Sequence, residues 1–141
     1  MVKKEKIVLE VGKRRLAVAR ALVKAGTGKV FINSKPLEFW GTDVLRMWIR
    51  EPLILAGDSI KNIDIEVNVK GGGIVGQAEA IRQAIAKGLV SYLKDKKLKE
   101  KFMKYDRNLL VYDPRRNEPH HSSGRGASKR GSRRHKQRSK R

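Results

Sequence analysis

The sequence predicts an α+β domain in which helices pack on a sheet, followed by a basic tail. Segments whose apolar residues fall at every second position alternate with segments whose apolar residues recur every three to four positions. The 141 residues are enough for one domain with a buried core. Because the composition changes near residue 113, we expect a globular body over 1–113 and an extended tail over 114–141 that is disordered away from its partner.

The first part of the body is predicted to hold three strands. Lys6 to Val11 forms the first, Gly12 to Arg15 interrupts it, and Leu16 to Lys24 forms the second. Gly26 to Gly28 indicates a turn. We therefore expect the third strand, Lys29 to Asn33, to close a hairpin with the second.

A short helix is expected next, over Val44 to Arg50. Thr42 or Asp43 can cap its N-terminus, because a side-chain oxygen at that position accepts a backbone N–H. Pro52 lacks an N–H and crowds the preceding turn, so the helix is expected to end near it.

The clearest patterns lie in the middle of the chain. Residues 63–70 alternate strictly between apolar and polar side chains, which predicts a strand with one buried face. After three glycines, residues 75–93 carry apolar side chains at helical spacing, with Gln83 among the polar residues largely off that stripe. This is the longest predicted helix.

The body is expected to end with a helix and a strand. A basic helix over Lys96 to Lys104 would turn Leu98 and Phe102 inward, and Leu109 to Tyr112 would form the last short strand. The predicted order is therefore three strands, a helix, a strand, two helices and a strand, followed by the tail.

A formal net charge of +20 indicates a polyanionic partner, and nucleic acid is the natural one. A membrane is not expected, because no apolar run exceeds four residues and a transmembrane helix needs about twenty. The absence of cysteine excludes disulfides and thiolate chemistry. The N-terminus does not resemble a signal peptide, so we expect a cytoplasmic protein.

Half of the excess charge belongs to the tail. Residues 1–113 hold 23 Lys or Arg and 13 Asp or Glu, a net +10, whereas residues 114–141 hold 11 Lys or Arg and only Glu118, again a net +10. After Pro119 the one apolar residue is Ala127, so this segment cannot bury enough surface to fold alone. We expect it to become ordered on a polyanion.

The glycines between the predicted strand and the long helix could contact phosphate. Gly71 to Gly76 has the spacing of a P-loop, but Gln77 and Ala78 replace the Lys and Ser/Thr that a nucleotide site requires, which argues against NTP hydrolysis. Two interpretations remain and are compatible with each other. The glycines permit a tight turn, and their backbone N–H groups contact a nucleic-acid phosphate.

No residue pattern indicates catalysis. The three histidines, His120, His121 and His135, all lie in the tail, where no packed second shell could hold a metal or a general base. The acidic residues of the body are scattered singly. We therefore expect no enzyme activity, metal, cofactor or small-molecule substrate.

Two basic clusters are candidate contacts. Strand alternation from Lys13 to Arg20 would place Arg14 and Arg20 on one face of the sheet and Lys13 and Arg15 on the other. Arg115 and Arg116 lie between two prolines, which limit backbone freedom and favour a guanidinium held ready for phosphate.

Several blocks together resemble the universal small-subunit ribosomal protein nine family, in its archaeal and eukaryotic branch. They are Gly12 to Arg20 (GKRRLAVAR), Gly71 to Ala78 (GGGIVGQA), Asp106 to Asn108, Asp113 to Arg116, Glu118 with Pro119, and the terminal Ser139 to Arg141. The blocks follow the family's order, and the resemblance spans essentially the whole chain.

The resemblance implies a mixed sheet of four to five strands with a left-handed β-α-β crossover. It also implies a structural protein of the small ribosomal subunit, in the cytoplasm, whose partners are small-subunit rRNA in the head, neighbouring small-subunit proteins and the anticodon stem-loop of peptidyl-site tRNA. The rRNA candidates are Lys13, Arg14, Arg15, Arg20, Gly71, Gly72, Gly73, Arg115, Arg116, Arg125, Lys129, Arg130, Arg133 and Arg134. The tRNA candidates are Arg138, Ser139, Lys140 and Arg141 at the tip.

A histone-like protein that binds DNA without sequence preference is the alternative. The charge and the tail fit this function equally well, but the ordered blocks do not. Sedimentation of the protein with small ribosomal subunits rather than with chromatin would distinguish the two.

Overall fold

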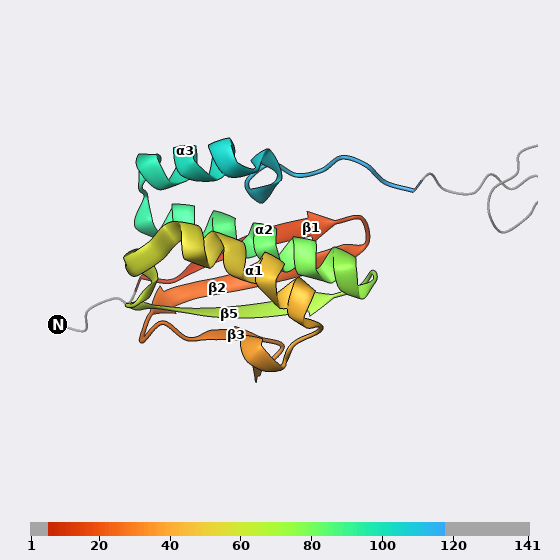
Figure 1. Ribbon diagram of the computed structural model, residues 1–141, viewed down its shortest axis with the longest axis horizontal. Helices are drawn as coiled ribbons and strands as arrows, with labels where there is room; N and C mark the ends of the chain where they lie inside the picture. The colour runs from red at the N-terminus through yellow and green to blue at the C-terminus, as the bar shows by residue number, and fades with distance from the viewer. Residues whose placement is uncertain (1–5, 118–141) are drawn as a thin grey trace, which may run out of the picture.

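The computed structural model of the protein describes residues 6–117 and has the expected α+β architecture, built on one mixed sheet (Figure 1). The strands are β1 (Val8–Arg14), β2 (Ala17–Ala25), β3 (Val30–Ile32), β4 (Lys35–Pro36) and β5 (Ile63–Lys70). Their order across the sheet is β1-β2-β5-β3-β4. β5 pairs antiparallel with β2 and parallel with β3, so the predicted mixed sheet is confirmed.

The predicted hairpin between the second and third strands is wrong, because β5 lies between β2 and β3. β5 buries the side chains at every second position, from Ile63 to Val69, and it pairs on both edges. The hairpin that does form joins β1 to β2 through a tight turn at Arg15, whose φ is 52°. Residues 26–28 instead lead from the central part of the sheet to β3.

The β2–β3 connection is held by Asp64 of β5. Its Oδ1 accepts the backbone N–H groups of Thr27 at 2.7 Å and Lys29 at 3.0 Å. These hydrogen bonds hold the pKa of the Asp64 carboxyl below its ordinary value because they favour the charged form, and the one from Lys29 contributes most, followed by the one from Thr27. The connection therefore depends on the ionised carboxylate.

The crossover from β3 to β5 passes through α1 (Asp43–Ala56). Figure 1 places α1 in front of the sheet, with the parallel strands β3 and β5 running to the right and β5 above β3. A chain that passes in front of the sheet from β3 up to β5 turns in the left-handed sense. Since about 98% of such crossovers are right-handed, this rare handedness agrees with the implied one.

α1 is longer than predicted, because it continues through Pro52 to Ala56. Proline inside a helix removes one backbone hydrogen bond and crowds the preceding turn, at a cost of about 3 kcal/mol. Here the Pro52 ring is fully buried, and Leu53 and Leu55 pack against the core beyond it. This apolar burial offsets the cost and keeps the helix intact. Thr42 occupies the N-cap position, but its side chain makes no capping hydrogen bond.

The other two helices agree with the sequence-based expectation. α2 (Ile74–Leu93) lies across β1, β2 and β5, and α3 (Lys96–Tyr105) packs on the helical layer (Figure 1). The Asp95 side chain caps α3 by accepting the N–H of Lys97 at 2.9 Å. No helix of the described part is long and apolar enough to span a membrane.

The predicted last strand at 109–112 does not form. Arg107–Leu109 is a 3-10 turn, and residues 110–117 follow without pairing to the sheet. Two backbone carbonyls of this segment instead accept hydrogen bonds from the Gln83 side chain of α2. A helix side chain therefore replaces the expected neighbouring strand.

The core lies between the sheet and α2, and small residues where β2 meets α2 allow the two elements to approach closely. β2 contributes Ala17, Ala19, Ala21 and Val23, and α2 contributes Ala80, Ile81, Ala84, Ile85 and Leu89, all fully buried. Gly12 of β1 permits the closest approach, because a Cβ there would lie 2.1 Å from the Ala80 carbonyl oxygen. α2 is consequently held directly against the β1–β2 hairpin.

We expect Gly12→Ala to lower the free energy of unfolding of the full-length chain by about 3 kcal/mol, because the new methyl group meets helix backbone that cannot move aside. Gly76→Ala is the matched control. Gly76 lies inside α2, and a Cβ there meets nothing closer than 3.7 Å. This control should stabilise the protein by about 0.5–1 kcal/mol. Urea denaturation followed by circular dichroism measures both, and equal effects would contradict the close approach.

We expect the stabilisation by Asp64 to be lost in acid. Because the folded-state pKa lies below the unfolded value of about 3.9, the contribution is complete above that pH and disappears as the pH falls through the folded-state pKa. Asp64→Asn should lower the urea midpoint at pH 7 and show a smaller loss of stability between pH 4 and pH 2 than the wild type. A difference between the two proteins that does not change with pH would refute this.

Candidate RNA interface

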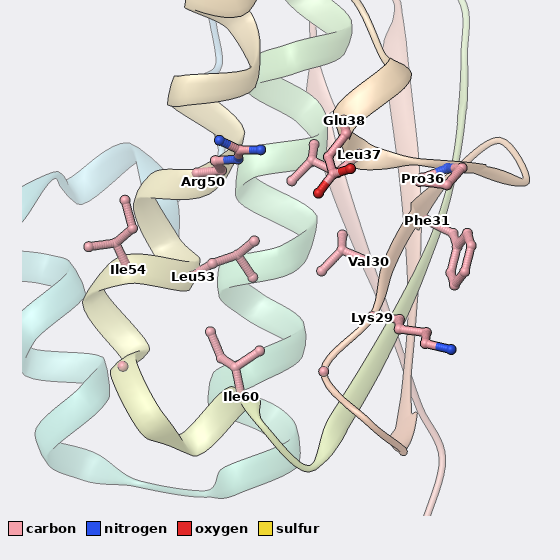
Figure 2. Close-up of a pocket in the computed structure, with 12 residues that line it drawn as sticks. Lys29, Val30, Phe31, Pro36, Leu37, Glu38, Arg50, Leu53, Ile54 and Ile60 are labelled. Carbon is pink, nitrogen blue, oxygen red and sulfur yellow. The ribbon is translucent and has the colours of Figure 1, made fainter.

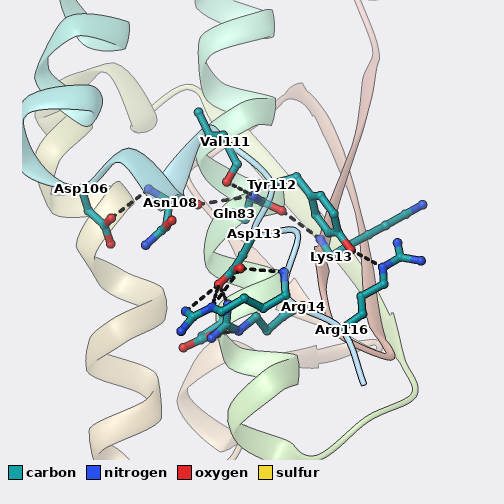
Figure 3. Close-up of polar contacts among 11 residues, drawn as sticks. Lys13, Arg14, Gln83, Asp106, Asn108, Val111, Tyr112, Asp113 and Arg116 are labelled. Carbon is teal, nitrogen blue, oxygen red and sulfur yellow. Dashed lines mark hydrogen bonds and ion pairs between the residues drawn. The ribbon is translucent and has the colours of Figure 1, made fainter. Parts of the chain in front are cut away.

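The Gln83 side chain of α2 joins β1 to the segment that follows α3 (Figure 3). Its amide oxygen accepts the backbone N–H of Lys13 at 2.9 Å. Its amide nitrogen donates to the carbonyl of Val111 at 2.9 Å and to that of Asn108 at 3.3 Å. The side chain is 4% exposed, so these hydrogen bonds form away from water and hold three segments together.

Asp113 forms ion pairs with two arginines. Arg14, at the end of β1, forms an ion pair with its Oδ2, and the Arg14 Nε also lies 2.5 Å from Oε2 of Glu79 on α2. Arg115 places Nε at 3.0 Å and Nη2 at 2.7 Å from the same Oδ2. The Arg115 backbone N–H donates to Oδ1 at 3.0 Å. Asp113 is only 9% exposed, so its charge is matched almost entirely by these partners.

A second ion cluster joins the helices to the same segment. Arg82 of α2 lies 2.5 Å from Glu51 of α1 and 2.9 Å from Asp106, which precedes the 3-10 turn. The Asp106 Oδ1 also accepts the N–H of Asn108 at 2.8 Å. α1, α2 and the segment after α3 are therefore held in one arrangement at this end of the molecule.

Arg116 is oriented by Tyr112. Its Nε donates to the tyrosine hydroxyl at 2.7 Å, and its guanidinium lies 5.5 Å from the centre of the ring. Arg115 and Arg116 are thus both held by side chains of the preceding residues, as expected for rigidly placed cations. The tyrosine was not among the sequence-based candidates.

The expected placement of the first basic cluster is wrong in one respect. Arg14 and Arg20 lie on opposite faces, because strand alternation does not continue through the tight turn at Arg15. Arg14 lies on the helix side with Glu79. Arg20 is paired across from Val11 and shares the opposite face with Lys13. The exposed Lys70 of β5 lies across from Val18 on that same face.

The face away from α2 is consequently a basic surface on the sheet, which we call the open face, with Lys13, Arg20 and Lys70 exposed on it. Val11 and Val18 are half-buried and pair with these cations. Leu9 and Leu22 pair with each other further along the same face, which there also carries Glu66 and Asp64 of β5. Sequence reasoning did not select Lys70, although the alternation of residues 63–70 already assigns it to the exposed side of the strand.

The glycine loop is primarily a tight turn. Gly71 and Gly72 have φ of 79° and 66°, which other residues rarely adopt. A Cβ on Gly71 would also lie 2.5 Å from the Leu16 carbonyl oxygen. Gly73 has ordinary backbone angles and open space around it, and it caps the N-terminus of α2. The conformational requirement therefore applies to the first two glycines only.

A basic hollow lies where this loop meets the β1–β2 turn. It has a volume of about 440 Å³, and its lining includes Arg14, Arg15, Gly72, Gly73 and Asn117. Glu79 also lines it and is paired with Arg14, so Arg15 supplies the net positive charge of the hollow. Here an exposed arginine lies near the N-terminus of a 20-residue helix, where the helix dipole favours negative charge. Residues far apart in the sequence are thus brought together as a site suited to a phosphate.

A larger groove lies at the other edge of the sheet (Figure 2). Its volume is about 760 Å³, and α1 lines one side while β3 and the segment after β4 line the other. Val30, Leu37, Leu53, Ile54 and Ile60 make most of the lining apolar, with Lys29, Glu38 and Arg50 among them. This groove contains none of the predicted site residues, and its apolar character does not suit a phosphate.

The tail candidates lie outside the described residues. They are Arg125, Lys129, Arg130, Arg133 and Arg134 for rRNA, and Arg138, Ser139, Lys140 and Arg141 for tRNA. Within residues 6–117, no three His, Asp or Glu side chains are grouped as a metal site would require.

A family model described as ribosomal protein S9/S16 matches residues 12–141 of the chain. A protein of Methanococcus maripaludis named small ribosomal subunit protein uS9 is 52% identical over 118 residues, which cover 84% of this chain and 88% of the relative. Proteins of the same name from Pyrobaculum aerophilum and Desulfurococcus amylolyticus are each 50% identical. They cover 80% and 82% of this chain, and 80% and 83% of their own lengths.

Proposed function

The chain belongs to the ribosomal protein S9/S16 family, and we propose that it is a structural constituent of the small ribosomal subunit in the cytoplasm. Its body binds small-subunit rRNA in the subunit head, beside neighbouring ribosomal proteins, and its tail contacts the anticodon stem-loop of peptidyl-site tRNA. The observation that carries the rRNA part is the basic hollow, where Arg15, the glycine backbone and the start of α2 lie together. The tRNA part rests on the family resemblance of the terminal Ser139 to Arg141.

The body offers two surfaces to rRNA. In the hollow, the Arg15 guanidinium and the backbone N–H groups at Gly72 and Gly73 are donors suited to a phosphate. On the open face, Lys13, Arg20 and Lys70 supply exposed positive charge. Contacts of this kind fix the orientation of a protein on RNA without reading its sequence.

The arginines beside acidic residues have a different part in this function. Arg14 already contacts both Glu79 and Asp113. We therefore assign it mainly to holding the end of β1 against α2 and against the tail root, by which we mean Asp113 and the residues just after it. The Arg115 side chain is 71% exposed although it contacts Asp113, which leaves it accessible to a phosphate. Arg116 is accessible in the same way, with Tyr112 setting its orientation.

The alternative of a histone-like DNA-binding protein explains the charge but not the membership of a ribosomal protein family. The proposed function includes no catalysis, and the relatives are named as proteins of the small ribosomal subunit.

Removing the tip should separate the two proposed activities. We expect deletion of Ser139 to Arg141, or the double substitution Lys140→Ala with Arg141→Ala, to leave incorporation into small subunits unchanged. Affinity for peptidyl-site tRNA should fall about tenfold, the equivalent of roughly 1.4 kcal/mol, as expected when charge-assisted contacts in partly solvated surroundings are lost. Filter binding of tRNA to purified subunits measures this. Subunits that lack the truncated protein would contradict the division of labour.

The tail should bind RNA chiefly by releasing counterions. Nine Lys and Arg residues follow Pro119. If each neutralises one phosphate, they contribute a slope of roughly −6 to −8 to a plot of log affinity for purified small-subunit rRNA against log salt concentration. A variant with these nine residues replaced by Gln should lose that part of the slope. A wild-type slope near −1 would refute the electrostatic account.

A further inference from the structure

Asp113 is the last residue of the body and carries a charge that is largely hidden from water. We propose that Asp113, with Arg14 and Arg115, forms a clasp that sets the direction in which the C-terminal tail leaves the RNA-binding body. This inference rests on the proposed function, in which body and tail contact different RNAs. Asp113 is then a positioning residue for the tail, although it contacts no RNA itself.

The clasp attaches the tail root at a defined place. Arg14 is the last residue of β1, and its backbone lies in register with Ala17 of β2. Its guanidinium contacts both Glu79 of α2 and Asp113. The carboxylate of Asp113 is therefore tied at once to the sheet and to the helix that covers it. Because neither element can shift without disturbing the core, the position of residue 113 is fixed.

The clasp also sets the direction in which the chain leaves. Oδ1 of Asp113 accepts the Arg115 backbone N–H at 3.0 Å, which closes a local turn around Pro114. The Arg115 side chain folds back onto the same carboxylate through Nε and Nη2. Proline at position 114 restricts the backbone inside this turn. Chain direction is thus defined over residues 113–115.

Neighbouring contacts support the same path. Gln83 holds the Val111 carbonyl at 2.9 Å, and Arg116 is held against Tyr112. The path reaches Asn117, which lines the basic hollow together with Arg14 and Arg15. The tail is therefore released beside the surface proposed to bind rRNA. Without the clasp, the same tail would leave the body over a wider range of directions.

The test uses the absence of cysteine from the chain. Gln137→Cys near the tip carries a tethered iron chelate that generates hydroxyl radicals, in full-length protein reconstituted into small subunits with bound tRNA. The variant Asp113→Asn keeps the shape of the side chain and removes its charge. We expect it to be incorporated normally, and cleavage of the peptidyl-site tRNA to fall about fivefold, as for the loss of one partly buried ion pair.

Asp106→Asn is the matched control, because Asp106 is a carboxylate of the same segment that pairs with Arg82 rather than with the tail root. It should leave the cleavage pattern unchanged. If the wild-type probe cleaves rRNA but no tRNA, the tRNA contact fails while the clasp is still tested. In that case Asp113→Asn should spread the rRNA cleavage over more positions.

Identical cleavage by Asp113→Asn and wild-type subunits would overturn the proposal. If Asp113→Asn is not incorporated, Arg115→Ala replaces it, since its side chain is 71% exposed and leaves the pair between Asp113 and Arg14 in place. That variant should show a weaker change in the same direction, and the wild-type pattern there would equally overturn the clasp.

Discussion

The close contact between α2 and the β1–β2 hairpin is the constraint on which the rest of this molecule depends. It requires Gly12 opposite the helix backbone and alanines along β2, and it buries the larger aliphatic side chains of α2 against them. Because interiors are packed as densely as organic crystals, such a contact allows little movement. Every polar side chain of α2 therefore has a fixed position relative to the sheet.

Three of those side chains organise the functional end of the body. Glu79, Arg82 and Gln83 lie within one turn or so of each other on α2. Glu79 reaches β1, Arg82 reaches both α1 and the segment after α3, and Gln83 reaches both β1 and the segment after α3. The N-terminus of the same helix forms part of the basic hollow. One helix thus supplies both the anchor of the tail root and the dipole that favours phosphate.

The charges of the body divide into two groups with different physical roles. Arg14 and Arg82 face carboxylates and are mostly buried, and breaking such a pair leaves an uncompensated charge. Lys13, Arg20 and Lys70 are exposed on the open face. A net charge of +20 does not reveal this division, because composition counts paired and exposed cations alike. Binding to a polyanion draws mainly on the second group.

The sequence by itself determined the elements whose signal is local: the strand at 63–70, the long helix that follows, the basic helix after it and the basic tail composition. Hydrophobic period and intrinsic propensity act over a few residues, so these elements were predictable.

Three features depended on tertiary structure alone. They are the pairing of β5 between β2 and β3, the continuation of α1 through Pro52, and the replacement of the last strand by Gln83. Each is decided by which surface a segment meets, and a buried glutamine whose partners are backbone groups leaves no mark in the sequence. The basic hollow and the Asp113 clasp belong to the second kind, because their residues come from three distant parts of the chain that only the packing of α2 brings together.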